Sequence, residues 1–160
     1  LPVIEKTRDA VHADAGVFVD ALAANGLSLD LSEMAEAARF VTPVGPPRRF
    51  DTRFFVAAAP ADQIAKHDEE EVVQHVWIEP GEAIAQFRND AFPMMSVTHR
   101  MLACLARYET VAELMAVAHE RKPIQRVRVN DPDGAYEVVL PGEPGYETAD
   151  LEIEHGWIRI

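Results

Sequence analysis

Apolar residues near the start of the chain recur three and four positions apart, which is the spacing of one helix face. The residues that follow this spacing are Ala10, Val11, Val17, Phe18, Ala21 and Leu22. Asn25 and Gly26 then form a typical helix stop. The first thirty residues are therefore expected to be helical, and Ser32 with nearby acidic residues predicts one further turn.

From residue 38 onward the helical spacing gives way to strand-like segments. Residues 39–42 predict a strand that ends at Pro43. Residues 49–57 predict a second strand, because Phe50, Thr52, Phe54 and Val56 alternate with Arg49, Asp51, Arg53 and Phe55. Residues 72–78 alternate in the same way and predict a third strand.

Three helices and a set of short strands are expected in the second half of the chain. Pro80 suits the first turn of a helix, Ser96 or Thr98 can cap the next, and Thr110 can cap the third. After Pro123 the pattern predicts a hairpin of residues 126–129 and 136–140 around a turn at 131–134, and a last strand at 151–160. We therefore expect an α+β fold, with one domain at residues 1–122 and a C-terminal β hairpin or extension at 123–160.

The composition narrows the classes of partner. The chain of 160 residues has 27 acidic and 15 basic residues and a formal net charge of −12, which disfavours a protein that binds nucleic acid through its phosphates. Because no apolar run approaches the roughly 20 residues that span a bilayer, no membrane association is expected. The single cysteine, Cys104, allows no internal disulfide and is expected to be a buried thiol. We expect a cytoplasmic protein.

Four segments in order resemble the coenzyme A diphosphatase-like branch of the Nudix hydrolases. They are Phe40-Val41-Thr42-Pro43, the run from Arg48 through Arg49, Phe50, Asp51, Thr52 and Arg53 to Phe54 and Phe55, the acidic cluster Asp68-Glu69-Glu70-Glu71, and Trp77-Ile78-Glu79-Pro80. The family usually has Trp where this chain has Phe40. The resemblance implies a Nudix-type mixed sheet packed with helices, here incomplete and followed by the C-terminal β extension.

The metal-binding segment of that family has no counterpart in this sequence. Nudix hydrolases hold Mg²⁺ or Mn²⁺ through an Arg-Glu-x-x-Glu-Glu segment, whose carboxylates lie together on one helix face. Residues 5–9 offer two acids and an arginine without that spacing. The resemblance places the segment before Leu1, so we expect that the chain either has lost it or comes from a longer protein.

Four residues form a candidate site. Arg49, Asp51 and Arg53 share one face of a predicted strand, where the two arginines can bind an anionic substrate and Asp51 can orient a guanidinium group. The alternative is a set of structural salt bridges across the sheet, which is the interpretation that the residues themselves favour. Glu71 matches a family position near the metal, sometimes a general base, and its alternative is a solvated acidic loop.

The resemblance implies a pyrophosphatase (diphosphatase) that hydrolyses a nucleoside-diphosphate-linked small molecule, such as a coenzyme A derivative. Without the metal-binding segment, we expect the 160-residue chain to be inactive. The alternative is a non-catalytic binding or interaction module, or a homodimer. The six histidines are scattered along the chain and predict no metal site.

Overall fold

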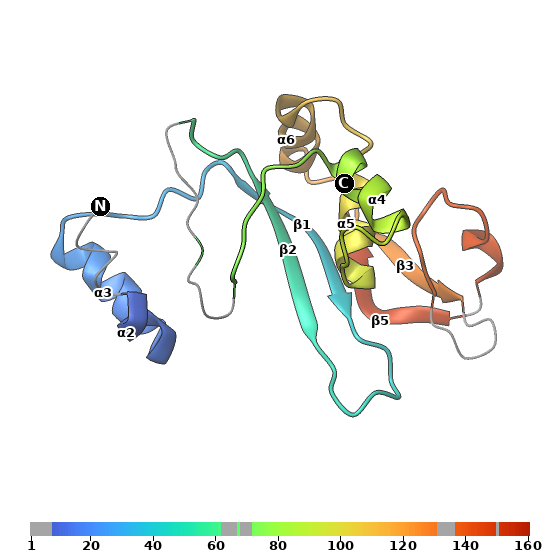
Figure 1. The fold of residues 1–160 in the computed structure, drawn as a ribbon, viewed down its shortest axis with the longest axis horizontal. Helices are drawn as coiled ribbons and strands as arrows, with labels where there is room; N and C mark the ends of the chain where they lie inside the picture. The colour runs from blue at the N-terminus through green and yellow to red at the C-terminus, as the bar shows by residue number, and fades with distance from the viewer. Residues whose placement is uncertain (1–7, 62–66, 68–71, 131–136, 150) are drawn as a thin grey trace. The chain divides into compact units, whose positions relative to one another are not determined.

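A computed structural model of the chain describes residues 8–61, 67, 72–130, 137–149 and 151–160 (Figure 1). The chain divides into two compact units, Leu1–Glu33 and Met34–Ile160, and each is described by itself. Within the described part of the chain, every helix is too short or too polar to cross a bilayer.

The first unit contains the helices α2 (Arg8–Ala13) and α3 (Gly16–Ala24), as the apolar spacing predicts. They are separated because the Asp14 carboxylate accepts a hydrogen bond from the backbone N–H of Gly16 at 2.8 Å, which competes with helical hydrogen bonding. The helix α3 ends where Gly26 adopts a φ of 65°, a left-handed conformation that glycine tolerates well. The predicted stop is confirmed.

The second unit is built on a five-stranded sheet with the order β2-β1-β5-β3-β4. Its strands are β1 (Met34–Val41), β2 (Asp51–Ala57), β3 (Gln125–Asn130), β4 (Glu137–Val139) and β5 (Leu151–Ile158). Every described strand pair is antiparallel, so the expectation of a mixed sheet is wrong. The segment expected as a C-terminal β extension supplies β3, β4 and β5, and β5 pairs directly with β1.

One face of the sheet forms the core. Ala38 lies opposite Phe54 on β2 and opposite Ile158 on β5, and the rings of Phe40 and Phe54 meet edge to face at 5.6 Å. The helices α5 (Ser96–Leu105) and α6 (Val111–His119) contribute Met101, Cys104, Met115 and Ala118 to the same cluster. Packing against this face explains why the predicted alternation of residues 49–57 buries Val56 and leaves Phe55 exposed.

The opposite face carries charged and aromatic side chains. Arg39 pairs with Arg53 on one side and with Trp157 on the other, and Trp157 in turn pairs with Arg126. Directly opposed residues point to the same side of a sheet, so these four positions form one row across four strands. The row includes Arg53, one of the predicted site residues.

The three helices of this unit begin in different ways. The helix α4 (Pro80–Arg88) has its proline in the first turn, as predicted. Thr110 caps α6, as predicted, and its hydroxyl accepts the N–H of Glu113 at 3.1 Å. The predicted caps of α5 are wrong: its N-cap is Met95, which makes no side-chain cap.

Two local expectations fail because tertiary pairing decides the outcome. Residues 72–78 have the alternation of a strand but form none, and the side chains of Val73 and Trp77 are 72% and 74% exposed. Residues 34–36, expected to lie near a helical turn, instead open β1 against β2. The predicted turn at 131–134 lies outside the described residues, while the hairpin it joins is present as β3 and β4.

Candidate functional site

Asp51 at the start of β2 is held by an arginine on the neighbouring strand. Arg39 donates to the Asp51 carboxylate through Nε at 2.7 Å and also through Nη2, so the two planar groups meet side by side. This two-point geometry is the strongest form of arginine–carboxylate contact. Hydrogen bonding to Asp51 raises the pKa of Arg39, against an opposing effect of burial.

Arg53 forms a looser pair with Glu36 across the same two strands. Its Nη1 lies 3.4 Å from Glu36 Oε1, and the Arg53 side chain is 60% exposed. The two contacts together form a charge ladder, defined as Glu36 and Arg39 on β1 with Asp51 and Arg53 on β2. Because the Arg53 side chain is mostly exposed and its contact with Glu36 is long, the side chain is accessible to a ligand.

The other two predicted site residues lie elsewhere. Arg49 precedes β2, and its Nε donates to the carbonyl oxygen of Thr42 at 2.8 Å. The Thr42 hydroxyl also accepts the N–H of Phe50 at 3.0 Å, so Arg49 belongs to the connection that joins β1 to β2. Glu71 lies outside the described residues. The structure thus places Asp51 and Arg53 on one face of β2, and Arg49 in the connection just before that strand.

A cavity of about 380 Å³ lies between the start of β1 and the end of α6. It is lined by Met34, Ala35, Glu36, Ala118, His119, Arg121 and Arg159. Glu36 therefore belongs both to the charge ladder and to this cavity. No local motif predicts this set of residues, because they come from three parts of the chain.

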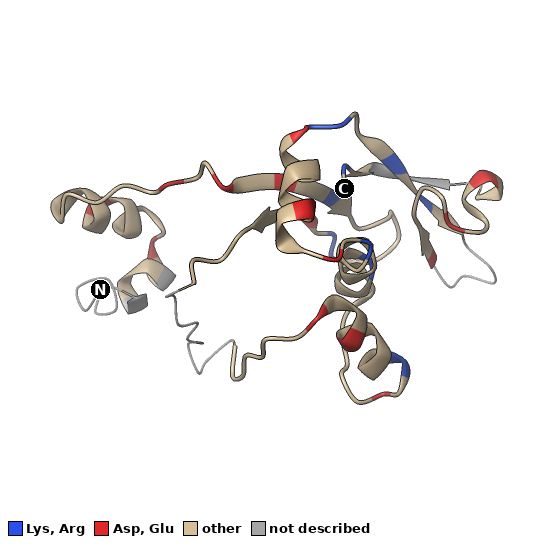
Figure 2. Ribbon diagram, turned by 90° about the horizontal axis from the view of Figure 1, so that it is seen from above, with Lys and Arg blue, Asp and Glu red and all other residues tan. Residues whose placement is uncertain are grey.

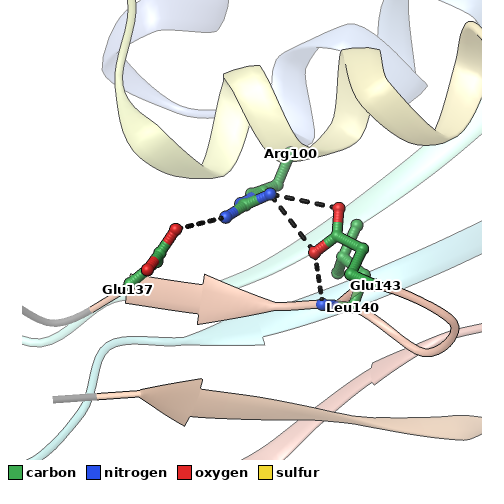
Figure 3. Close-up of polar contacts among 4 residues, drawn as sticks. All are labelled: Arg100, Glu137, Leu140 and Glu143. Atoms are coloured by element: carbon green, nitrogen blue, oxygen red, sulfur yellow. Dashed lines mark hydrogen bonds and ion pairs between the residues drawn. The ribbon is translucent and has the colours of Figure 1, made fainter. Parts of the chain in front are cut away.

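A second polar cluster joins α5 to the loop after β4 (Figure 3). Arg100 Nη1 lies 3.1 and 3.3 Å from the two carboxylate oxygens of Glu143, and Glu143 Oε2 also accepts the N–H of Leu140 at 2.8 Å. Arg100 makes a longer contact of 3.5 Å with Glu137. Arg100 and Glu143 balance each other's charge and satisfy each other's hydrogen-bonding groups. This cluster is therefore best explained as a structural link between α5 and the sheet.

The described part of the chain contains a buried cysteine and a contact between two histidines. Burial raises the pKa of the Cys104 thiol to about 11, so it remains protonated at neutral pH, in keeping with the expected buried thiol. His67 and His75 meet with their Nδ1 atoms 2.8 Å apart, a contact that the scattered sequence positions did not predict.

The described residues also do not fit the implied Mg²⁺ or Mn²⁺. Among them, no three His, Cys, Asp or Glu side chains lie close enough together to hold a metal ion. The two acids of the charge ladder instead face arginines. The metal therefore stays a prediction from the resemblance.

The sequence has no match among protein-family models, characterised proteins or solved structures.

Proposed function

We propose that this chain carries the substrate-recognition part of a Nudix-type hydrolase that acts on a nucleoside-diphosphate-linked molecule, such as a coenzyme A derivative. The proposal rests first on the resemblance of residues 48–55 to that family. Its structural support is a single observation: the Arg53 side chain, on the strand face where the sequence predicts substrate binding, is 60% exposed on the edge strand β2.

The charge ladder suggests different roles for its two arginines, Arg39 and Arg53. Asp51 neutralises Arg39 and fixes its orientation, which leaves Arg53 as the more available donor. A guanidinium group matches the geometry of phosphate oxygens and stays charged at any physiological pH. The diphosphate of the substrate would therefore displace the loose contact between Arg53 and Glu36. Hydrolysis would require the family's metal carboxylates, which this sequence does not contain.

Binding of coenzyme A by isothermal titration calorimetry tests the proposal. Arg53→Gln should weaken binding about tenfold, since one charge-assisted hydrogen bond is worth roughly 1.4 kcal/mol or more. Arg88→Gln is the matched control, because Arg88 ends α4 and belongs to neither strand of the ladder. Equal affinities for the wild type and Arg53→Gln would refute the assigned role of Arg53.

The charge pairing itself favours a second candidate, a non-catalytic module in which the ladder is purely structural. Both acids of the ladder face arginines, as expected for side chains that link β1 to β2. In that case Arg53→Gln would leave coenzyme A affinity unchanged. Asp51→Asn would still lower the free energy of unfolding, because it disrupts the two-point contact with Arg39.

A further inference from the structure

We propose that the cavity between β1 and α6 is a binding site for a small phosphate-bearing anion. We call it the α6 cavity and define it by Glu36, His119, Arg121 and Arg159 with the apolar residues beside them. Its volume of about 380 Å³ falls within the range of small-molecule sites, which runs from roughly 300 to 1,000 Å³. The arginines of the cavity are separate from Arg49 and Arg53, and Glu36 is the residue that the cavity shares with the charge ladder.

The lining has an excess of positive charge in a chain whose net charge is −12. The lining contains two arginines, Arg121 and Arg159, and one carboxylate, Glu36. Glu36 Oε1 lies 3.4 Å from Arg53 Nη1 and is enclosed without a hydrogen-bond partner in the described part of the chain. In Figure 2, where Lys and Arg are blue, blue segments lie in the turn that follows α6 and beside the C-terminal end of the chain. A local excess of arginine on an acidic protein makes the electrostatic potential at the cavity more positive, which favours an anionic ligand.

Arg159 is held in place without a carboxylate partner. Its backbone N–H donates to the carbonyl oxygen of Ala37 at 2.9 Å, and its guanidinium lies 5.0 Å from the centre of the Trp157 ring. No ion pair of Arg159 occurs among the described residues, and its Nε is enclosed there without a hydrogen-bond acceptor. A guanidinium whose Nε lacks an acceptor among the described residues is suited to bind an oxyanion.

Arg121, the second arginine of the lining, lies directly after the C-cap of α6. It follows α6 with a φ of 49°, a left-handed conformation that glycine or asparagine adopts more readily than arginine. Helices commonly end with a residue in this conformation. The attraction of a cation to the end of a helix would explain a basic residue here, but it does not explain why Arg159 lines the same cavity.

A neighbouring cavity extends the site. Arg159 also lines a space of about 430 Å³ together with Arg107, Tyr108 and Lys122. Arg159 therefore lines both cavities, while Lys122 in the second is paired with Glu120 at 3.4 Å. This arrangement fits an anion with two linked phosphate groups better than a single phosphate, so pyrophosphate is the appropriate probe.

The test uses Trp157 as a reporter of binding. Trp77, the other tryptophan of the chain, is 74% exposed, so Trp77→Phe leaves Trp157 as the only source of tryptophan fluorescence. Pyrophosphate should change this fluorescence to saturation at fixed ionic strength. Inorganic phosphate should bind at least about tenfold more weakly, because it loses the contacts of one phosphate group. Absence of any pyrophosphate binding by calorimetry would overturn the proposal.

Variants locate the anion. Arg159→Gln should weaken pyrophosphate binding at least about tenfold, whereas the control Arg88→Gln should leave it unchanged. Arg121→Asn should weaken binding while it stabilises the fold, since asparagine tolerates the left-handed backbone. This variant keeps the test valid if Arg159→Gln unfolds the protein. Loss of binding in Arg53→Gln with normal binding in Arg121→Asn would place the anion on the charge ladder and refute the α6 cavity.

Discussion

Replacing Glu143 tests whether the cluster around Arg100 links α5 to the sheet as the geometry implies. The Glu143 carboxylate meets Arg100 with both oxygens and accepts the N–H of Leu140, a fully buried residue. Glu143→Ala removes both contacts at once. It leaves the Arg100 guanidinium, whose side chain is 17% exposed, with only its long contact to Glu137.

The expected cost follows from these two losses. A hydrogen bond to a charged group contributes about 1.5 kcal/mol or more, and an unsatisfied buried N–H costs at least about 1 kcal/mol. The Glu143 side chain is 25% exposed, so solvent screening reduces the first term. Glu143→Ala should therefore lower the free energy of unfolding by about 2 kcal/mol. Glu143→Gln retains an acceptor for Leu140 and should cost about 1 kcal/mol.

Urea denaturation followed by circular dichroism measures these values, and Glu137→Gln is the matched control. Glu137 is 60% exposed and lies 3.5 Å from Arg100, so its loss should cost no more than about 0.5 kcal/mol. A double-mutant cycle of Arg100→Met with Glu143→Ala should give a coupling energy of about 1 kcal/mol. Equal costs for Glu143→Ala and Glu137→Gln, or additive effects in the cycle, would refute the link.

Three further predictions concern single groups. Burial raises the pKa of the Cys104 thiol to about 11, so iodoacetamide should label it slowly in the native protein at neutral pH and rapidly in urea; equal rates would contradict its burial. Thr110→Ala should lower the free energy of unfolding by about 1 kcal/mol in urea denaturation, while Thr110→Ser keeps the cap and should cost little; equal losses would argue against capping. Burial, with further effects from Arg100 and Arg88, lowers the pKa of His99, so the unfolded state binds a proton more readily than the folded one. Stability should therefore fall as pH drops below the usual histidine range, and His99→Asn should reduce that fall; the same pH dependence in both proteins would exclude His99 as its source.

Local features of the sequence predicted most of the helices and strands. The cap at Thr110 and the proline at the start of α4 act within a few residues, so their patterns are sufficient. Residues 72–78 show where this reasoning fails: their alternation favours a strand, but a strand also needs a partner, and pairing is decided by distant parts of the chain.

The candidate site was only partly predictable for the same reason. The alternation of residues 49–57 placed Asp51 and Arg53 on one face, which the structure confirms. Their partners Arg39 and Glu36 depend on the register between β1 and β2, which includes a bulge after Glu36. The α6 cavity joins residues more than eighty positions apart, so no local pattern could predict it.

The most direct test of the account is to incubate the purified 160-residue chain with coenzyme A and Mg²⁺, and to measure both binding and hydrolysis. We predict binding that Arg53→Gln weakens about tenfold, without release of the products of diphosphate cleavage. Turnover by the wild-type chain would contradict the expectation that the catalytic carboxylates lie outside this sequence. Absence of binding would refute the assignment of substrate recognition to the face that carries Arg53.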